Sequence, residues 1–236
     1  MSQTDRLLGT LGYPCYLYTY LVAIATPKVE GIADMLEENE TRRAEILMVA
    51  ARLFIEKGFD AVTTLEIARC VHVSKRDLYR LFGSKQGMLD ALIHSHAAVM
   101  TRPLTLARAP LNRQAFLDIL REFGRSFLAE LLDPRRIALH RLAIASAPRS
   151  TKVGAALQEA GVEQVMDAAQ TFMRHAVAQG IVSREDAELI VTIFFDALIG
   201  PWQMRLLLGT HTPPDGVEIA ARADRAVEIV RRLIGA

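Results

Sequence analysis

Apolar residues recur at spacings of three and four along the chain from Thr41 onward, and no long stretch alternates between apolar and polar residues. The first spacing is that of one face of an α-helix, whereas alternation would indicate a half-buried strand. The pattern therefore predicts an all-α protein. The first predicted helix carries one apolar stripe and ends before Gly58, a residue type that commonly stops a helix. The stripe consists of Ile46, Val49, Ala50, Leu53 and Phe54.

Four later helices are predicted to begin in the same way. An apolar residue is followed by one whose side-chain oxygen can accept from free backbone N–H groups, and then by a second apolar residue in the first turn. The capping residues expected from this arrangement are Thr63, Ser74, Asn112 and Asp133.

The rest of the chain continues as helices. A break in the hydrogen-bond ladder is expected at Gly200-Pro201, because proline lacks the N–H group that the ladder needs. The helices are predicted over 113–131, 134–147, 153–179, 184–208 and 215–234.

Composition and charge change this picture only locally. Hydrophobic residues make up 51% of the chain and charged residues 23%, which is typical of a folded globular protein. The net charge of the chain is only +1, but binding of a DNA phosphate depends on the charges near the contact and not on the net charge of the whole chain. Four cations within eleven residues are opposed only by Asp77 and form a basic patch. They are Lys75, Arg76, Arg80 and Lys85.

The N-terminal residues 1–40 are predicted to be a loosely ordered extension. The apolar stretch from Leu11 to Ala25 is shorter than the roughly 20 residues that a membrane span needs. Two alternatives remain: a cytoplasmic extension, or a secretory signal with Ala23-Ile24-Ala25 as its cleavage site. The cytoplasmic alternative is preferred, with no membrane partner. Cys15 and Cys70 are too few for a disulfide framework and agree with a reducing compartment.

The segment from Val62 to Gln86 carries the most information about function. The caps Thr63 and Ser74 are eleven residues apart, which leaves two short helices and a tight connection between them. This is the spacing of a helix-turn-helix, whose second helix enters the major groove of DNA. The polar face of that helix carries Lys75, Arg76 and Arg80, while Leu78 is expected to pack inward.

Several of these residues together resemble the DNA-binding domain of the TetR family of repressors. The residues that carry the resemblance are Gly58-Phe59, Thr64, Ile67-Ala68, Val73-Ser74, Leu78-Tyr79, Phe82 and Ser84-Lys85. The resemblance implies DNA phosphate contacts for Thr64, Tyr79 and Lys85. The complete set of candidate DNA-binding residues is Thr63, Thr64, Ser74, Lys75, Arg76, Asp77, Tyr79, Arg80 and Lys85.

Two residues depart from the family pattern. His72 stands where glycine is usual, in a turn expected to need a left-handed backbone. Asp77 stands where a small hydroxyl residue is common, either as a capping partner of Ser74 or as an acceptor for a cytosine amino group. Other candidates have plainer alternatives: Tyr79 as a packed core ring, Lys85 as a solvated lysine, and the arginines as solvent-facing side chains. Arg76 is the candidate for a guanine edge.

Beyond the helix-turn-helix, the chain from Arg136 to Gly209 resembles the AefR-like subgroup of the same family, in diffuse pattern and in the motif Ala147-Pro148-Arg149. The resemblance implies dimerisation through the last two helices and a pocket for a small effector between the central ones. Polar or aromatic residues on apolar faces are the candidate effector contacts, with ordinary core or interface residues as the alternative. They are His140, Phe172, His175, Trp202 and Gln203.

The sequence therefore predicts three parts: the extension 1–40, a three-helix DNA-binding domain over 41–88, and a helical effector-binding and dimerisation domain over 89–236. The expected function is that of a homodimeric repressor released from a pseudo-palindromic operator by a small molecule, with no cofactor. An enzyme is the competing class, but G-x-S-x-G and phosphate-binding glycine loops are absent from the sequence. His94 and His96 lie on different sides of a helix and do not predict a metal site. A third alternative is a protein-binding module that kept the fold and lost DNA binding.

Overall fold

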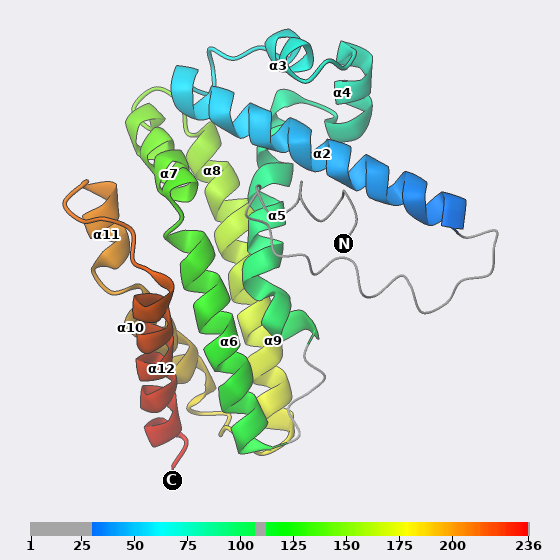
Figure 1. Cartoon of the computed structure of the whole chain (residues 1–236). Coiled ribbons are helices and arrows are strands. Elements are labelled where there is room, and N and C mark those ends of the chain that lie inside the picture. Colours follow the sequence, from blue (N-terminus) through cyan, green and yellow to red (C-terminus); the bar gives the residue numbers. More distant parts are fainter. Residues whose placement is uncertain (1–29, 107–111, 236) are drawn as a thin grey trace. The chain divides into compact units, whose positions relative to one another are not determined.

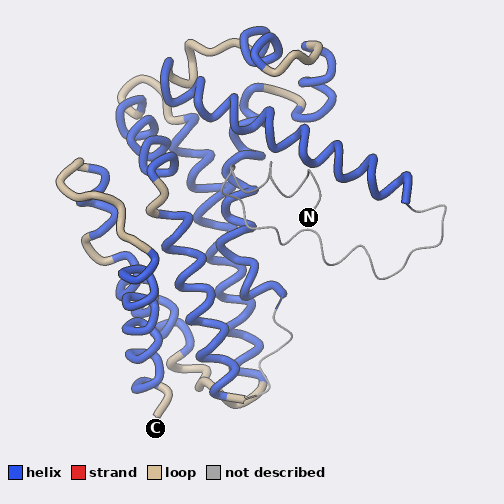
Figure 2. Tube along the Cα trace, viewed as in Figure 1, coloured by secondary structure: helices blue, strands red, loops and turns tan. Residues whose placement is uncertain are grey.

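The computed structural model describes residues 30–106 and 112–235, and these residues form helices and loops without any strand (Figure 2). The all-α prediction is confirmed. The chain divides into two compact units, Met1–Glu45 and Ile46–Ala236. The described part of the first unit is helical. In it, Arg42 and Glu45 form an ion pair, with 3.8 Å between Nη1 and Oε2.

The first described helix, α2, spans Glu30–Lys57, so it begins eleven residues before Thr41, where the helical apolar pattern becomes visible in the sequence. Residues 32–57 contain neither glycine nor proline, and they are rich in Glu, Leu and Met, which favour helix. Residues 30–40 of the predicted extension are thus helical. The apolar stretch Leu11–Ala25 lies outside the described residues.

All four predicted capping residues are confirmed. The Thr63 and Ser74 hydroxyls accept from the backbone N–H groups of Glu66 and Asp77 at 3.2 and 3.0 Å. The side chains of Asn112 and Asp133 accept from backbone N–H groups at 2.8 Å each. These caps begin four helices: α3 (Thr64–Cys70), α4 (Lys75–Phe82), α6 (Arg113–Leu131) and α7 (Pro134–Ser146).

The short helices α3 and α4 lie beside each other at one end of a long helix, α5 (Lys85–Leu106), which continues into the rest of the bundle (Figure 1). A buried cluster joins the C-terminal half of α2 to α3, α4 and the first half of α5. The same cluster includes Leu139 of α7 and Val153 of α8 (Lys152–Leu157). The predicted domain boundary at 88/89 falls within α5, where packing is continuous, and the division into domains remains a prediction.

A second buried cluster holds the remaining helices together. It lies among the second half of α5, α6, α9 (Glu163–Ala178), α10 (Ala187–Ile199) and α12 (Gly216–Leu233). Phe123 of α6 is central to it, with its ring centroid 6.1 Å from that of Phe194 and 5.8 Å from that of Phe195. Burial of several aromatic rings makes this the larger apolar core.

Two of the long helices predicted by the sequence are interrupted. The helix expected over 153–179 contains a π-helical segment, Gln158–Val162, between α8 and α9. Gly161 lies in this segment against α5, where a Cβ would be 3.1 Å from Cγ2 of Ile93. The helix expected over 184–208 is split into α10 and α11 (Trp202–Leu207), with Gly200 at a φ of 44°. This second break is the one expected at Gly200-Pro201.

Candidate nucleic-acid interface

Helix α4 has one buried and one exposed side. Leu78 and Phe82 are buried, whereas Lys75, Arg76 and Arg80 are exposed. Tyr79 is 45% exposed, which contradicts the alternative that it is a packed core ring. The Nζ of Lys75 lies 5.6 Å from the centroid of the Tyr79 ring, so the two side chains share the exposed side. The apolar side fixes the helix, and the basic side is left accessible.

The capping role of Asp77 is confirmed. Its backbone N–H donates to the Ser74 hydroxyl, which donates in turn to Oδ2 of Asp77 at 2.6 Å. The hydrogen bond from Ser74 lowers the pKa of the Asp77 carboxyl, and the nearby Arg80, 3.2 Å away, acts in the same direction. The carboxylate is therefore held at the start of α4. Acceptance from a cytosine remains a prediction.

The start of α3 presents the threonines. Thr63 is exposed and caps the helix, and Thr64 is its first residue and half-buried. Glu66, in the first turn, forms an ion pair with Lys57 near the end of α2. The N-terminus of a helix favours anions, which agrees with the predicted phosphate contact of Thr64.

Lys85 lies at the start of α5, but its ammonium group is not simply solvated. Its Nζ donates to the carbonyl oxygens of Phe59, Asp60 and Val62, in the loop before α3. This geometry contradicts the alternative of a solvated lysine. The phosphate contact implied by the family resemblance remains a prediction.

His72 adopts the left-handed backbone that the sequence predicted, with a φ of 52°. Among the described residues other than glycine, only His72 has a positive φ. The turn is closed by a 3.0 Å hydrogen bond from the N–H of Val73 to the carbonyl of Ala68. Histidine thus holds a conformation that suits glycine better.

Replacing His72 with glycine is expected to stabilise the protein. A left-handed backbone costs a non-glycine residue about 1–2 kcal/mol, part of which is offset by the greater freedom of glycine in the unfolded chain. We expect a net gain of about 0.5–1 kcal/mol, or a Tm higher by roughly 1–4 °C, measured by thermal unfolding. The control is Cys70→Gly, at the last helical residue of α3, which is expected to lower Tm because glycine disfavours a helical backbone. A lower Tm for His72→Gly would contradict the strain assigned to this turn.

The sequence reasoning missed Gly87. A Cβ at this position would lie 2.1 Å from the carbonyl oxygen of Phe82, the last residue of α4. Only glycine therefore allows this close approach of α4 to α5 without a shift of the backbone. A glycine in the first turn of a predicted helix was the available signal, since glycine disfavours helix.

The five predicted effector contacts do not lie together. Phe172 lines a small cavity of about 10 Å³, and Trp202 lines another pocket of about 180 Å³ with Arg222 and Arg225. His140 is hydrogen-bonded through Nδ1 to the carbonyl of Arg136 at 2.8 Å. His175 is exposed and Gln203 is half-buried, and neither lines either of these two pockets.

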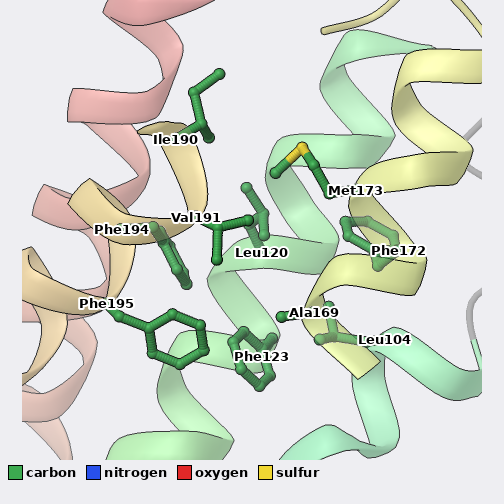
Figure 3. Close-up of a pocket in the computed structure, with 10 residues that line it drawn as sticks. All are labelled: Leu104, Leu120, Phe123, Ala169, Phe172, Met173, Ile190, Val191, Phe194 and Phe195. Atoms are coloured by element: carbon green, nitrogen blue, oxygen red, sulfur yellow. The ribbon is translucent and has the colours of Figure 1, made fainter. Parts of the chain in front are cut away.

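The cavity lined by Phe172 is formed entirely by apolar side chains from α5, α6, α9 and α10 (Figure 3). A volume of about 10 Å³ holds at most about one water molecule, so a larger ligand would fit only if the lining side chains moved. The lining residues are Leu104, Leu120, Phe123, Ala169, Phe172, Met173, Ile190, Val191, Phe194 and Phe195.

His96 of α5 is largely buried where it faces Glu130 of α6 and Arg136 of α7. Its Nδ1 contacts the Arg136 guanidinium and lies 3.3 Å from Oε2 of Glu130. Burial lowers the pKa of His96. No group of three or more potential ligands for a metal ion occurs in the described part of the chain.

Comparison with known proteins places this geometry in a family. Residues 46–92 match the family described as bacterial regulatory proteins of the tetR family. Residues 118–233 match the C-terminal domain of AefR-like transcriptional repressors. The two matches cover the helix-turn-helix and most of the helices behind it.

Individual relatives agree with these matches. A TetR transcriptional regulator from Agrobacterium tumefaciens has 30% identity and a TM-score of 0.65, over 81% of this chain and 93% of that one. The DNA-binding transcriptional repressor TetR of Mycobacteroides abscessus is 26% identical over 167 residues, 62% of this chain and 87% of the relative. The HTH-type transcriptional regulator YvkB of Bacillus subtilis is 42% identical over 53 residues, 22% of this chain and only 28% of the relative.

The fold and the exposed basic helix define a transcription regulator with an N-terminal helix-turn-helix DNA-binding domain and a helical C-terminal domain. The chain belongs to the TetR family, and its C-terminal domain is AefR-like. Because the relatives' names describe regulators of transcription, they favour the prediction that the chain is not an enzyme.

Proposed function

We propose that the protein is a homodimeric repressor that binds a pseudo-palindromic operator and leaves it when a small molecule enters its C-terminal domain. The observation that supports this best is helix α4, in which buried Leu78 and Phe82 fix a helix whose other side exposes Arg76 and Arg80. A short basic helix held in this way can enter a major groove. A cytoplasmic location accompanies the proposal.

Within this interface the candidate residues take different roles. Thr63, Thr64 and Tyr79 contact phosphates through their hydroxyl groups. Ser74 caps α4 and lies beside the DNA phosphate backbone. Lys75 and Arg80 contribute positive charge, which displaces counterions from DNA. Arg76 donates to a guanine edge. Asp77 caps α4, and its carboxylate, which only accepts hydrogen bonds, accepts from a cytosine amino group.

The dimer is proposed to form through α10 and α12. The run Ala187–Leu207 is apolar enough to cross a membrane by composition, yet only 28% of its most apolar window is buried within the protein. Leu189 on α10 and Val217 on α12 are 53% and 77% exposed. An apolar surface on two adjacent helices suits a four-helix interface with a second copy. Such a dimer would place two α4 helices about 34 Å apart.

The effector is proposed to be a small, uncharged and largely apolar molecule that opens the cavity lined by Phe172. A charged group there would be buried among carbon atoms without a partner, which is unfavourable. The flexible Met173 side chain and the half-buried Val191 are suited to move aside. Leu104 at the cavity lies on the helix that begins at Lys85, so a shift of α5 would reach the DNA-binding domain.

Filling this cavity is expected to abolish the effector response while leaving DNA binding intact. In Val191→Trp the indole would occupy the space that a ligand needs, whereas Gln170→Trp places the same ring on the exposed side of α9, next to the cavity-lining Ala169. Uncharged naphthalene is expected to raise the Tm of the wild type and of Gln170→Trp but not of Val191→Trp, and 2-naphthoate to raise none. An equal shift in all three proteins would contradict the site.

The repressor role is tested in cells. A reporter gene placed behind a promoter bound by the protein is expected to be silent when the protein is expressed and active when it is deleted. Lower reporter activity on deletion would identify an activator. The alternative of a protein-binding module without DNA binding rested on His72 and Asp77, and these residues now have local structural roles in the turn and in the cap of α4.

A further inference from the structure

The pocket lined by Trp202 has an excess of positive charge. The guanidinium carbon of Arg222 lies 4.9 Å from the centroid of the Trp202 ring, and the Nε of Arg222 donates to the carbonyl oxygen of Leu198 at 2.6 Å. Arg225 lines the same pocket and is exposed. Burial lowers the pKa of Arg222, and the positive charges of Arg225 and Arg205 act in the same direction. The pocket therefore favours an anion.

The carboxylate present in the pocket is already engaged. Among the five residues that line it, Glu218 alone is acidic. Its Oε2 accepts from the backbone N–H of Asp215 at 3.1 Å, in the capping box that begins α12. A volume of about 180 Å³ is far more than one water molecule needs, so a further carboxylate side chain can enter.

Helix α10 carries one carboxylate on its apolar outer side. Leu189, Ile193 and Asp196 follow one another at spacings of four and three, so they lie along the same side of the helix. Asp196 is exposed, and neither Asp196 nor Arg225 forms an ion pair with another described residue. In the proposed dimer this side is covered, and a carboxylate buried without a partner is strongly unfavourable. The interface therefore needs a cation opposite Asp196.

Asp196 and Arg225 lie near the same level of their two helices. The chain passes from α10 through α11 into α12, which runs back alongside α10 (Figure 1). The hydrogen bond from Arg222 to Leu198 fixes the register, and Arg225 lies one turn further along α12, back toward Asp196. In a dimer that presents both α4 helices to one duplex, the two-fold axis runs along the four-helix bundle and keeps each residue at its own level.

We propose that Asp196 of each copy enters the pocket of the other copy and forms an ion pair with the partner's Arg225, beside Arg222 and Trp202. The occupant of the pocket is thus a second copy of this chain. Because a two-fold interface is self-complementary, the pair occurs twice in each dimer. The inference rests on the proposed dimer and names the contact that completes each pocket.

The test exchanges the two charges between copies. Asp196→Arg and Arg225→Glu are made in separate chains that differ in mass. Each variant alone brings like charges together at both pairs, and its dimer dissociation constant is expected to rise at least about 100-fold. In a mixed dimer the two substitutions face each other at one pair, and the other pair is native.

The two variants are incubated together until their dimers have exchanged, and native mass spectrometry then gives the fraction of mixed dimer. We expect more than about 90%, where random pairing gives about half. The matched control mixes Asp167→Arg with Arg174→Glu, which carry the same charge changes at exposed positions of α9, and random pairing is expected. Asp196→Asn, a milder change, should raise the dimer dissociation constant about tenfold or more.

The results that would overturn the proposal differ from one another. Random pairing of Asp196→Arg with Arg225→Glu would exclude the contact between copies, and an ion pair within one chain would also give this result, because mixing cannot repair it. An unchanged dimer dissociation constant in Asp196→Asn would show that the carboxylate has no partner to lose. If the wild type sediments as a monomer, the proposed dimer itself fails, and the pair fails with it.

Discussion

Reversing two charges on α4, by Lys75→Glu together with Arg76→Glu, is expected to weaken operator binding at least about 100-fold at roughly 150 mM salt. Both side chains are exposed, and Arg76 lies on the side of α4 away from Leu78 and Phe82. Each dimer would exchange four cations for four anions facing phosphates, and Arg76 would lose its donors to a guanine edge. Kd is measured by fluorescence anisotropy on a labelled operator duplex.

The matched control is the double variant Arg174→Glu with Arg184→Glu, which makes the same charge change at two exposed positions of the C-terminal domain. It is expected to bind with close to wild-type affinity. Circular dichroism should show both double variants folded, because none of these four positions is buried. Equal losses in the two variants would attribute the effect to net charge and would contradict a specific role for α4.

The second large effect is expected from breaking the dimer. Ile193 of α10 is half-buried within one copy and lies one helical turn from the exposed Leu189. In Ile193→Glu a carboxylate would be desolvated at the proposed interface without a partner, which strongly disfavours association. Sedimentation velocity is expected to show a monomer, and operator affinity should fall about 100-fold or more because each reading helix then binds alone.

Gln179→Glu, at the exposed end of α9, adds the same charge away from α10 and α12 and is expected to remain dimeric. The helical circular dichroism of both variants should match the wild type. A dimeric Ile193→Glu protein would show that the copies associate through another surface, and the exposure of Leu189 and Val217 would then need a different explanation.

Local features of the fold could be predicted well from the sequence. The caps at Thr63, Ser74, Asn112 and Asp133 could be predicted because each is a local pattern. A residue with a side-chain oxygen stands between two apolar residues at the start of a helix. The left-handed turn at His72 was expected from the family resemblance, because glycine is usual at this position. The break at Gly200-Pro201 followed from the chemistry of proline.

Features that depend on contacts between distant residues could not be predicted. From the sequence, Lys85 is only a lysine at the start of a helix. The fold brings it to the carbonyl groups of residues that lie more than twenty positions before it in the chain. Likewise, Phe172 and Trp202 fit the same pattern of aromatic residues on apolar faces, yet they line different spaces. The π-helical segment arises where Gly161 packs against α5, a contact that helical periodicity does not reveal.

The central claim is that the exposed side of α4 reads DNA, and selection of genomic fragments by the purified protein tests it most directly. Fragments from the organism that encodes the chain are incubated at about 50 mM salt with the wild type or with the double variant Lys75→Glu, Arg76→Glu, and the retained DNA is sequenced. We predict that the wild type enriches fragments sharing an inverted repeat with half-sites about one helical turn apart, and that the double variant enriches none. Retention of no fragment by the wild type, or of the same fragments by both proteins, would contradict the account.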